Sequence, residues 1–422
     1  MAKVFRNVLI KNASQLVTCS GHAAKYGKDM SDLGIIENGA IACKDGIITH
    51  VGTTEEVLAQ VNESDYRVFN GKGHTVLPGF VDSHTHLVFD GYREDEFSWR
   101  LRGDSYMSIM QRGGGIINTM NATRAASSER LTLNACRYIE GMIKMGVTTI
   151  EAKSGYGLDK KTELKQLRVI KKLRKNFPID IISTFMGAHA VPPEYEGRAD
   201  AYIDYIISDV LPKVDYYQLA ECCDVFCEKG VFNIEQSERL LRAAMQYGLK
   251  PKLHADEMVD FGGAELAVKL GALSADHLLH VSDDNIRRLA ESSTVATLLP
   301  LTAFSLQEPY PRGREMIDAG CAVALATDLN PGSCFSYSIP MLFALACISM
   351  KLTPEEAVTA LTINGAAAVG RADSIGSLDV GKQADLVVLS YPSYRFLLYH
   401  VGVNAVRITF KRGELASLSS VF

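Results

Sequence analysis

The sequence contains no apolar run long enough to cross a membrane. The longest, IPMLFALACISM at residues 339–350, falls far short of the roughly 20 residues that a membrane-spanning helix needs. Charged residues interrupt the apolar positions of the first segment, MAKVFRNVLIKNASQLV, whereas a secretion signal has a continuous apolar stretch. We therefore expect neither secretion nor membrane insertion, and we predict a cytoplasmic protein.

The sequence also lacks an excess of basic charge and a regular pattern of cysteines. Its formal net charge is −5 and it has no long run of lysines and arginines, so its charge does not favour nucleic acid or an anionic membrane as a partner. Nine irregularly spaced cysteines in a chain of 422 residues are more typical of reduced thiols than of a disulfide framework. We expect a folded protein that acts on a small molecule.

Helical and strand patterns alternate along the middle of the chain. From about Leu131 onward, a stretch of helical periodicity ends at a glycine and is followed by a short apolar run, with Gly146, Gly248, Gly271 and Gly320 at the joins. Eight parallel strands separated by helices favour a closed, TIM-like (β/α)8 barrel over an open sheet. The eight candidate strands lie at residues 75–86, 147–153, 179–190, 222–230, 250–257, 273–278, 295–300 and 323–328.

The two ends of the chain have a different pattern. Residues 1–72 and 378–422 contain short alternating stretches broken by glycine and aspartate, which are typical of β-strands with one buried face. We predict a small β-sandwich domain built from both termini, with the barrel at 73–377. Thr353, Pro354 and Glu356 form a capping-box pattern that predicts a late helix, and we expect that helix to join the two domains.

Several polar residues stand where predicted strands end, which in a barrel is the side that carries the active site. The first strand ends in His84 and His86, which share a face because strand side chains alternate. His254 ends the fifth strand and Asp328 ends the eighth. An isolated pair of alternating histidines is a weak signal, but a third imidazole and a carboxylate at neighbouring strand ends favour one transition metal ion such as zinc or iron.

The sequence motifs resemble those of a known group of enzymes. PGFVDSHTH, the later histidines and aspartate, and GSLDVGKQADLVVL near the end are similar to the amidohydrolase superfamily of metal-dependent hydrolases. Within it, EAKSGYGL, FMGAHAVPPEY, KLHADE, SADHL and ATDLNPGS resemble the imidazolonepropionase family. The resemblance implies hydrolysis of the ring lactam of 4-imidazolone-5-propanoate to N-formimidoyl-L-glutamate in histidine degradation, by a homodimer.

The resemblance also implies roles for individual residues. His84, His86, His254 and Asp328 would bind the metal ion. Asp328 would also take a proton from the attacking water, assisted by two further catalytic residues. His277 would hydrogen-bond the carbonyl oxygen where negative charge develops, and Glu257 would shuttle protons or, alternatively, orient a ligand histidine. The residues expected to contact the substrate are Arg93, Tyr156, His189, Glu257, Asn330, Gly332 and Ser333.

Other interpretations of the same residues remain open. Arg93 could pair on the surface with Glu94 or Asp95 instead of binding the propionate. A second metal could be bridged near Glu228, where related enzymes carry a carboxylated lysine; Lys153 closes a different strand.

Two other sequence features and two competing functions also remain open. Cys222, Cys223 and Cys227 are expected in the core rather than in a metal cluster, and the glycines 113–115 could form a lid. A nucleobase deaminase of the same superfamily and a non-catalytic barrel are the competing functions.

Overall fold

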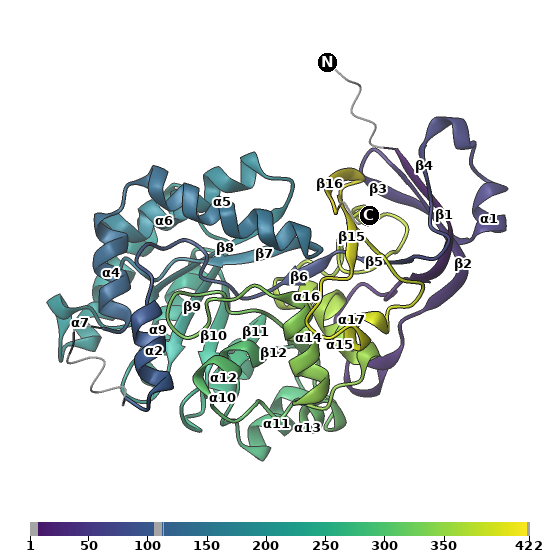
Figure 1. The fold of residues 1–422 in the computed structure, drawn as a ribbon. Coiled ribbons are helices and arrows are strands. Elements are labelled where there is room, and N and C mark those ends of the chain that lie inside the picture. Colours follow the sequence, from purple (N-terminus) through teal and green to yellow (C-terminus); the bar gives the residue numbers. More distant parts are fainter. Residues whose placement is uncertain (1–6, 105–111, 113, 420–422) are drawn as a thin grey trace.

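The computed structural model describes residues 7–104, 112 and 114–419, which form a barrel and a smaller β domain (Figure 1). Gly113, the first glycine of the predicted lid, lies outside the described residues. Among the described residues, no helix is both long and apolar enough to cross a membrane. The predicted fold class, a distorted barrel with a small β-sandwich domain built from both termini, is confirmed as a nearly closed barrel with a separate β domain, whose strands belong to one hydrogen-bonded sheet.

Eight parallel strands form the barrel sheet, one from each of the predicted runs. In sheet order they are β6 (Phe80–Asp82), β7 (Val147–Lys153), β8 (Asp180–Ala188), β9 (Cys222–Cys227), β10 (Lys250–Ala255), β11 (Ser274–His277), β12 (Val295–Leu298) and β13 (Val323–Leu325). Chain order and sheet order coincide because each strand is followed by a crossover that returns the chain to the same end of the sheet.

Helices surround the barrel strands (Figure 1). These helices are amphipathic. In α5, for example, one face is buried at helical spacing through Leu131, Ala135, Ile139 and Met142. The helices of this layer are α2 (Glu94–Leu101), α4 (Ile116–Ala125), α5 (Ser128–Lys144), α6 (Lys160–Asn176), α7 (Ala199–Tyr205), α8 (Leu211–Tyr216), α9 (Ile234–Gln246), α10 (Gly263–Leu270), α11 (Asp283–Ala290), α12 (Pro300–Leu306), α13 (Gly313–Asp318) and α14 (Ile339–Ile348).

The barrel closes by a single bridge beyond the ends of its first and last strands. Within the described parts of the chain no ladder pairs β6 with β13, but Thr85 and Leu329 form an isolated parallel bridge. The backbone N–H of Asp328 donates to the carbonyl of His84 at 3.0 Å, and the N–H of His86 donates to that of Leu329 at 2.8 Å. The backbone atoms that close the barrel therefore belong to predicted metal ligands and their neighbours.

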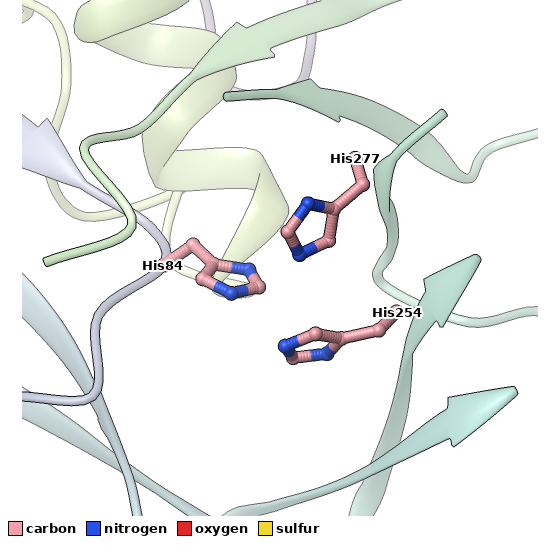
Figure 2. Close-up of side chains that lie close together, drawn as sticks. All are labelled: His84, His254 and His277. Atoms are coloured by element: carbon pink, nitrogen blue, oxygen red, sulfur yellow. The ribbon is translucent and has the colours of Figure 1, made fainter. Parts of the chain in front are cut away.

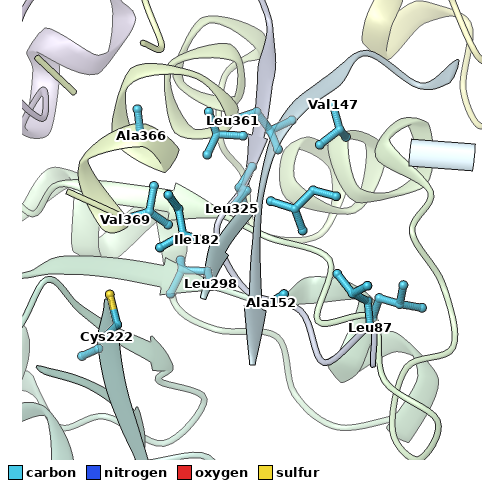
Figure 3. Packing of buried hydrophobic residues seen from close by; sticks show 14 of the residues in the cluster. Leu87, Val147, Ala152, Ile182, Cys222, Leu298, Leu325, Leu361, Ala366 and Val369 are labelled. Carbon is cyan, nitrogen blue, oxygen red and sulfur yellow. The ribbon is translucent and has the colours of Figure 1, made fainter. Parts of the chain in front are cut away.

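Two late helices, α15 (Pro354–Leu361) and α16 (Ile363–Ala368), pack against this closure. Leu361 and Ala366 share one core cluster with Leu298 of β12 and Leu325 of β13 (Figure 3). The ammonium group of Lys252, inside the barrel, donates to the carbonyl of Ala368 at 3.2 Å, where a helix end carries partial negative charge. The late helices thus cover the barrel where its first and last strands meet.

The small domain is one mixed sheet made from both ends of the chain. Val76 and Leu77 of β5 pair with Val388 and Val387 of β14, and because side chains alternate, the two valines Val76 and Val388 enter a separate small-domain core while the other two face the barrel core. The elements of this domain are β1 (Val8–Val17), β2 (Ile35–Lys44), β3 (Ile47–Thr53), α1 (Thr54–Leu58), β4 (Arg67–Asn70), β5 (Thr75–Pro78), β14 (Leu386–Leu389), α17 (Phe396–Tyr399), β15 (Val406–Lys411) and β16 (Glu414–Leu418).

The predicted first strand at residues 75–86 is two strands in the structure. β5 belongs to the small sheet and β6 to the barrel, with Gly79 between them. A side chain at Gly79 would lie 2.2 Å from the hydroxyl of Thr148, so only glycine lets the chain cross between the sheets here. The predicted domain boundary at residue 72 falls just before β5.

The predicted capping box is present at the start of α15. The Thr353 hydroxyl accepts the N–H of Glu356 at 3.2 Å, and the Glu356 carboxylate accepts the N–H of Thr353 at 2.7 Å. Arg314 also binds both oxygens of Glu356, at 2.8 and 3.0 Å. This arrangement fixes the helix that packs against the barrel closure.

We predict that Thr353→Ala lowers the free energy of unfolding by about 1 kcal/mol, because it removes the hydroxyl that satisfies a helix N–H. Urea unfolding followed by circular dichroism measures the change. Thr132→Ala is the matched control: Thr132 lies inside α5, where its hydroxyl bonds the carbonyl of Ser128, and alanine favours the helix interior. Equal destabilisation by both variants would contradict the capping role.

Candidate metal centre and active site

Four buried side chains from three parts of the barrel lie beside one another. His84 and His86 follow β6, His254 stands on β10 and Asp328 follows β13, and each is at most 3% exposed. Nε2 of His254 lies 3.3 Å from Nε2 of His86. Asp328 Oδ1 lies 3.5 Å from Nε2 of His84 and 3.8 Å from Nε2 of His86. The structure brings together all four predicted metal ligands.

The ligand atoms of this cluster suit a transition metal ion. His84, His86 and Asp328 each offer one ligand atom, all within 4.8 Å of one another, and His84 with His254 and His277 does the same (Figure 2). Nε2 of His84 is buried and has no hydrogen-bond partner among the described residues. Such an orphaned lone pair is expected where a cation binds.

The protonation states of these groups fit a cation. Burial lowers the pKa of His84, His86 and His254 well below the usual value, so their imidazoles are neutral and present lone pairs. Burial raises the pKa of Asp328 to about 7, because the hydrogen bond from Thr302 and the positive charge of Lys153 offset only part of the loss of water. A metal ion bound at Asp328 would supply a closer positive charge. The residues present therefore fit a metal site.

Two buried carboxylates fix the orientation of two ligand imidazoles through their Nδ1 atoms. Nδ1 of His84 lies 2.6 Å from Asp276 Oδ2, and Nδ1 of His254 lies 3.1 Å from Asp224 Oδ1. Each carboxylate holds a proton on Nδ1, which leaves Nε2 free to bind a metal. Asp224 also accepts the backbone N–H of His254 at 3.1 Å. Both imidazole rings are thus fixed in position and in tautomer.

Two buried lysines hold these carboxylates in turn. Nζ of Lys153 lies 2.6 Å from Asp224 and 2.9 Å from Glu151, and Nζ of Lys252 lies 3.4 Å from Glu151 and 3.6 Å from Asp276. Burial alone would lower the pKa of Lys153, but the surrounding carboxylates outweigh it and hold that pKa above its usual range. Both lysines therefore lie among the carboxylates that orient the ligand imidazoles.

A pattern in the sequence indicates this network. Glu151 and Lys153 are two residues apart on β7, and Lys252 and His254 are two residues apart on β10. Strand side chains two apart share a face, so charged residues in these apolar runs face the barrel interior with the ligands.

A cavity of about 770 Å³ opens beside the four ligands. Tyr156 is 2% exposed, and the His189 ring stacks on His86 with centroids 4.9 Å apart. Nδ1 of His189 lies 3.0 Å from the carbonyl of Gly155, so that nitrogen carries the proton and Nε2 is left as an acceptor. The predicted residues that line the cavity are His86, Arg93, Tyr156, His189, His254, Glu257, His277, Asp328, Asn330 and Ser333.

His277 and Glu257 form a pair at the edge of the metal cluster. Nδ1 of His277 lies 3.5 Å from Glu257 Oε1, and neither nitrogen of His277 has a hydrogen-bond partner among the described residues. Burial lowers the pKa of His277 to about 3. Burial, reinforced by the charge of Asp328, raises that of Glu257 to about 8. His277 is thus a neutral imidazole beside a protonated carboxyl group.

Arg93 points into the cavity rather than along the surface. Its Nη1 lies 3.9 Å from Glu96 Oε2, and this is the ion pair it makes within the described chain, not one with Glu94 or Asp95. A side chain at Gly332 would lie 1.2 Å from Nη2 of Arg93, so the guanidinium occupies the space that glycine leaves. Gly332 therefore makes room for Arg93, and its predicted contact with the substrate stays a prediction.

Asn330 organises the turn that follows Asp328. Its Oδ1 accepts the N–H groups of Gly332 and Ser333, each at 2.8 Å, and its Nδ2 donates to the carbonyl of Asp328 at 2.7 Å. These bonds use the amide group within its own loop, so the fold itself requires Asn330. A direct contact with substrate stays a prediction.

The structure does not favour the two alternative metal sites, one near Glu228 and one at the cysteines. The oxygens of Glu228 accept the N–H groups of Lys229 at 2.9 Å and Met258 at 2.8 Å. Within the described part of the chain, the groups able to hold a metal contain neither Glu228 nor a cysteine. Cys222, Cys223 and Cys227 are buried and free. A single metal site from histidines and aspartate fits these observations better.

We predict that Lys153→Met lowers metal affinity 10-fold or more, because Asp224 and Glu151 lose their cation and the His254 imidazole loses its fixed orientation. Dialysis against graded chelator, followed by metal analysis, measures the affinity. Lys411→Met is the matched control, since Lys411 is also buried between two carboxylates, Asp180 and Asp385, but lies in the small sheet. Equal metal loss in both variants would contradict this role.

Comparison with known proteins agrees with the site and the fold. A model of the amidohydrolase family matches residues 239–416. The imidazolonepropionase of Parabacteroides distasonis is 64% identical over 408 residues, which cover 97% of this chain and 98% of the relative. The imidazolonepropionase of Clostridium tetani is 57% identical over 409 residues, with 97% and 98% covered.

Solved structures share the fold at much lower identity. An adenosine deaminase from Xanthomonas campestris with bound zinc is 19% identical, with a TM-score of 0.69 and 98% and 94% of the two chains covered. An atrazine chlorohydrolase from Arthrobacter aurescens TC1 complexed with zinc is 15% identical, with a TM-score of 0.74 and 97% and 94% covered. The high identity to the two curated relatives, along nearly the whole chain, shows that this protein belongs to the imidazolonepropionase family of metal-dependent amidohydrolases.

Proposed function

We propose that this chain hydrolyses the ring lactam of 4-imidazolone-5-propanoate to N-formimidoyl-L-glutamate, a step of histidine degradation. The observation that carries the proposal is the convergence of three neutral imidazoles and Asp328 beside a cavity that also contains the guanidinium of Arg93. The imidazoles and the carboxylate suit a metal-dependent hydrolase, and the guanidinium suits a substrate that carries a carboxylate.

We propose His84, His86, His254 and Asp328 as the residues that hold one zinc or iron ion, since three imidazoles and a carboxylate accept either metal. When bound, the ion supplies a Lewis acid that lowers the pKa of water and polarises the lactam carbonyl. The engagement of Glu228 by two backbone N–H groups supports one ion rather than two.

We assign to Asp328 the proton transfer that hydrolysis requires. The hydroxyl of Thr302 donates to its Oδ2 at 2.6 Å, which leaves Oδ1 facing the imidazoles. Water adds its oxygen to the carbonyl carbon while Asp328 accepts a proton from it. The carbon–nitrogen bond of the lactam then breaks, and the ring nitrogen receives that proton.

His277 acts on the lactam oxygen of the substrate, and Glu257 acts on the substrate ring. One N–H of neutral His277 hydrogen-bonds the lactam oxygen as negative charge develops on it. Protonated Glu257, 3.5 Å from His277, donates to the substrate ring or exchanges a proton with it. Because both groups are buried, their hydrogen bonds are stronger than they would be in water.

The remaining cavity residues bind and orient the substrate. The guanidinium of Arg93 pairs with the propionate, and Tyr156 and His189 contact the substrate beside His86. Ser333 contributes its hydroxyl or backbone from the loop that Asn330 holds. A neutral nucleobase has no carboxylate for Arg93 to bind, which argues against a deaminase.

We also infer that the protein works in the cytoplasm as a homodimer. All nine cysteines lie in the described residues and form no disulfide, which fits a reducing compartment. The family resemblance supports the dimer. Size-exclusion chromatography with light scattering tests it.

The test of function follows the loss of imidazolone absorbance when the metal-loaded protein meets freshly made imidazolonepropionate. Guanine, cytosine and hydantoins are run beside it. Chelation should abolish the activity, and zinc or iron should restore it. Turnover of a nucleobase without turnover of the imidazolone would overturn the assignment, and metal analysis of the purified protein identifies the ion.

We predict that Asp328→Asn lowers kcat at least 10³-fold, because an amide cannot accept the proton of the attacking water. Single-turnover kinetics at saturating substrate measure the effect. Asp318→Asn on exposed α13 is the control and should leave kcat unchanged. Residual activity within 10-fold of the wild type would remove Asp328 from the proposed role.

Arg93→Ala is expected to raise KM about 10-fold to 100-fold with a smaller effect on kcat. A hydrogen-bonded charge pair contributes about 1.5–3 kcal/mol, and the carboxylate lies away from the reacting bond. Initial rates over a wide range of substrate concentration separate the two constants. An unchanged KM would contradict the carboxylate role.

A further inference from the structure

A second arginine, Arg100, lies beside Arg93 in the cavity wall. Arg93 immediately precedes α2 and Arg100 stands near its end, seven residues apart, so they share one helix face. Both contact Gly332. Nη2 of Arg100 donates to its carbonyl at 3.1 Å, and Nη2 of Arg93 occupies the space where its side chain would be. The two guanidinium groups are therefore neighbours.

This pair of guanidinium groups has unused hydrogen-bond donors. Nε of Arg93 and Nη1 of Arg100 are buried and have no partner among the described residues. Buried charged N–H groups are costly to leave unpaired. Both residues line the cavity beside the metal cluster, so a ligand in the cavity can satisfy them.

The local charge is positive and incompletely balanced. Glu96 is the carboxylate next to Arg93, but its Oε2 also accepts the N–H of Gly115 at 3.0 Å. Asp104, another cavity residue, pairs with Arg112 at 3.0 Å. Burial and the neighbouring Arg93 lower the pKa of Arg100, the effect expected of two cations held close together. Two guanidinium groups and one carboxylate leave one positive charge for a ligand.

We propose that Arg100 is a second carboxylate-binding residue, which binds the substrate's propionate together with Arg93 and makes the site specific for an anionic side chain. This inference rests on the proposed function, because it assigns the carboxylate to that substrate. Two guanidinium groups surround a carboxylate from two sides and supply more N–H donors than one arginine can direct to it.

A purely structural role for Arg100 makes a different prediction. Through its bond to Gly332, Arg100 also supports the loop that begins at Asp328. Loss of that support would weaken every ligand of the cavity alike. A carboxylate-binding role affects only ligands that carry the carboxylate, so two ligands with the same ring separate the two roles.

The test measures binding by calorimetry to the metal-loaded protein, with 3-(imidazol-4-yl)propanoate and 4-ethylimidazole as probes. Both have the same ring and lack the lactam, so neither is hydrolysed. We expect Arg100→Met to weaken binding of the propanoate 10-fold or more and to leave that of 4-ethylimidazole within twofold. Arg100→Lys should restore part of the loss, since it keeps the charge but not the planar donor pair.

Arg102→Met is the matched control, because Arg102 ends the same helix and is exposed. It should leave the binding of both probes unchanged. Equal weakening of both probes by Arg100→Met, or no weakening of either, would overturn the proposal. Because binding is measured without turnover, failure of the wild type to hydrolyse imidazolonepropionate would refute the proposed function but leave this test intact.

Discussion

The closure of the barrel is the interaction on which the rest of the site depends. The Asp82 carboxylate, at the end of β6, accepts the N–H of Thr327 at 3.0 Å and its hydroxyl at 2.6 Å, and the Thr85–Leu329 bridge lies just beyond. These contacts fix the ends of the first and last strands against each other. Since His84, His86 and Asp328 belong to the same two segments, the bonds that close the fold also set the distances between the ligand atoms.

The buried ions beneath the ligands serve orientation more than stability. Removing two lysines and three carboxylates from water costs more free energy than most ion pairs return, so a core of apolar residues would stabilise the barrel as well. What these groups provide is fixed direction for the His84 and His254 imidazoles. If all five groups are ionised, two lysines and three carboxylates carry one net negative charge. That charge favours a cation on the side of the two imidazoles that faces away from these carboxylates.

The sequence predicts those features of the fold and the site that depend on local periodicity. Apolar runs between helical stretches located all eight strands, and the polar residues at their ends included the four ligands that converge. Features that depend on three-dimensional packing were not predictable in this way. The division of residues 75–86 at Gly79 follows from contact with Thr148, which is distant in sequence. The sequence does not single out Arg100, because one arginine among charged helix residues has no distinctive pattern until Gly332 is placed beside it.

The loop after Asp328 connects the chemistry to substrate recognition. It begins at a metal-ligand candidate with φ of 53°, a strained conformation for aspartate that its surroundings must hold in place. Asn330 fixes the turn through its amide, and Gly332 then contacts both Arg93 and Arg100. The distance between the candidate metal ligand Asp328 and the two arginines is therefore set within five residues of one loop. With the roles proposed for Asp328, Arg93 and Arg100, such a site would select a substrate by the length between its reacting carbonyl and its carboxylate, because neither end could move without the other.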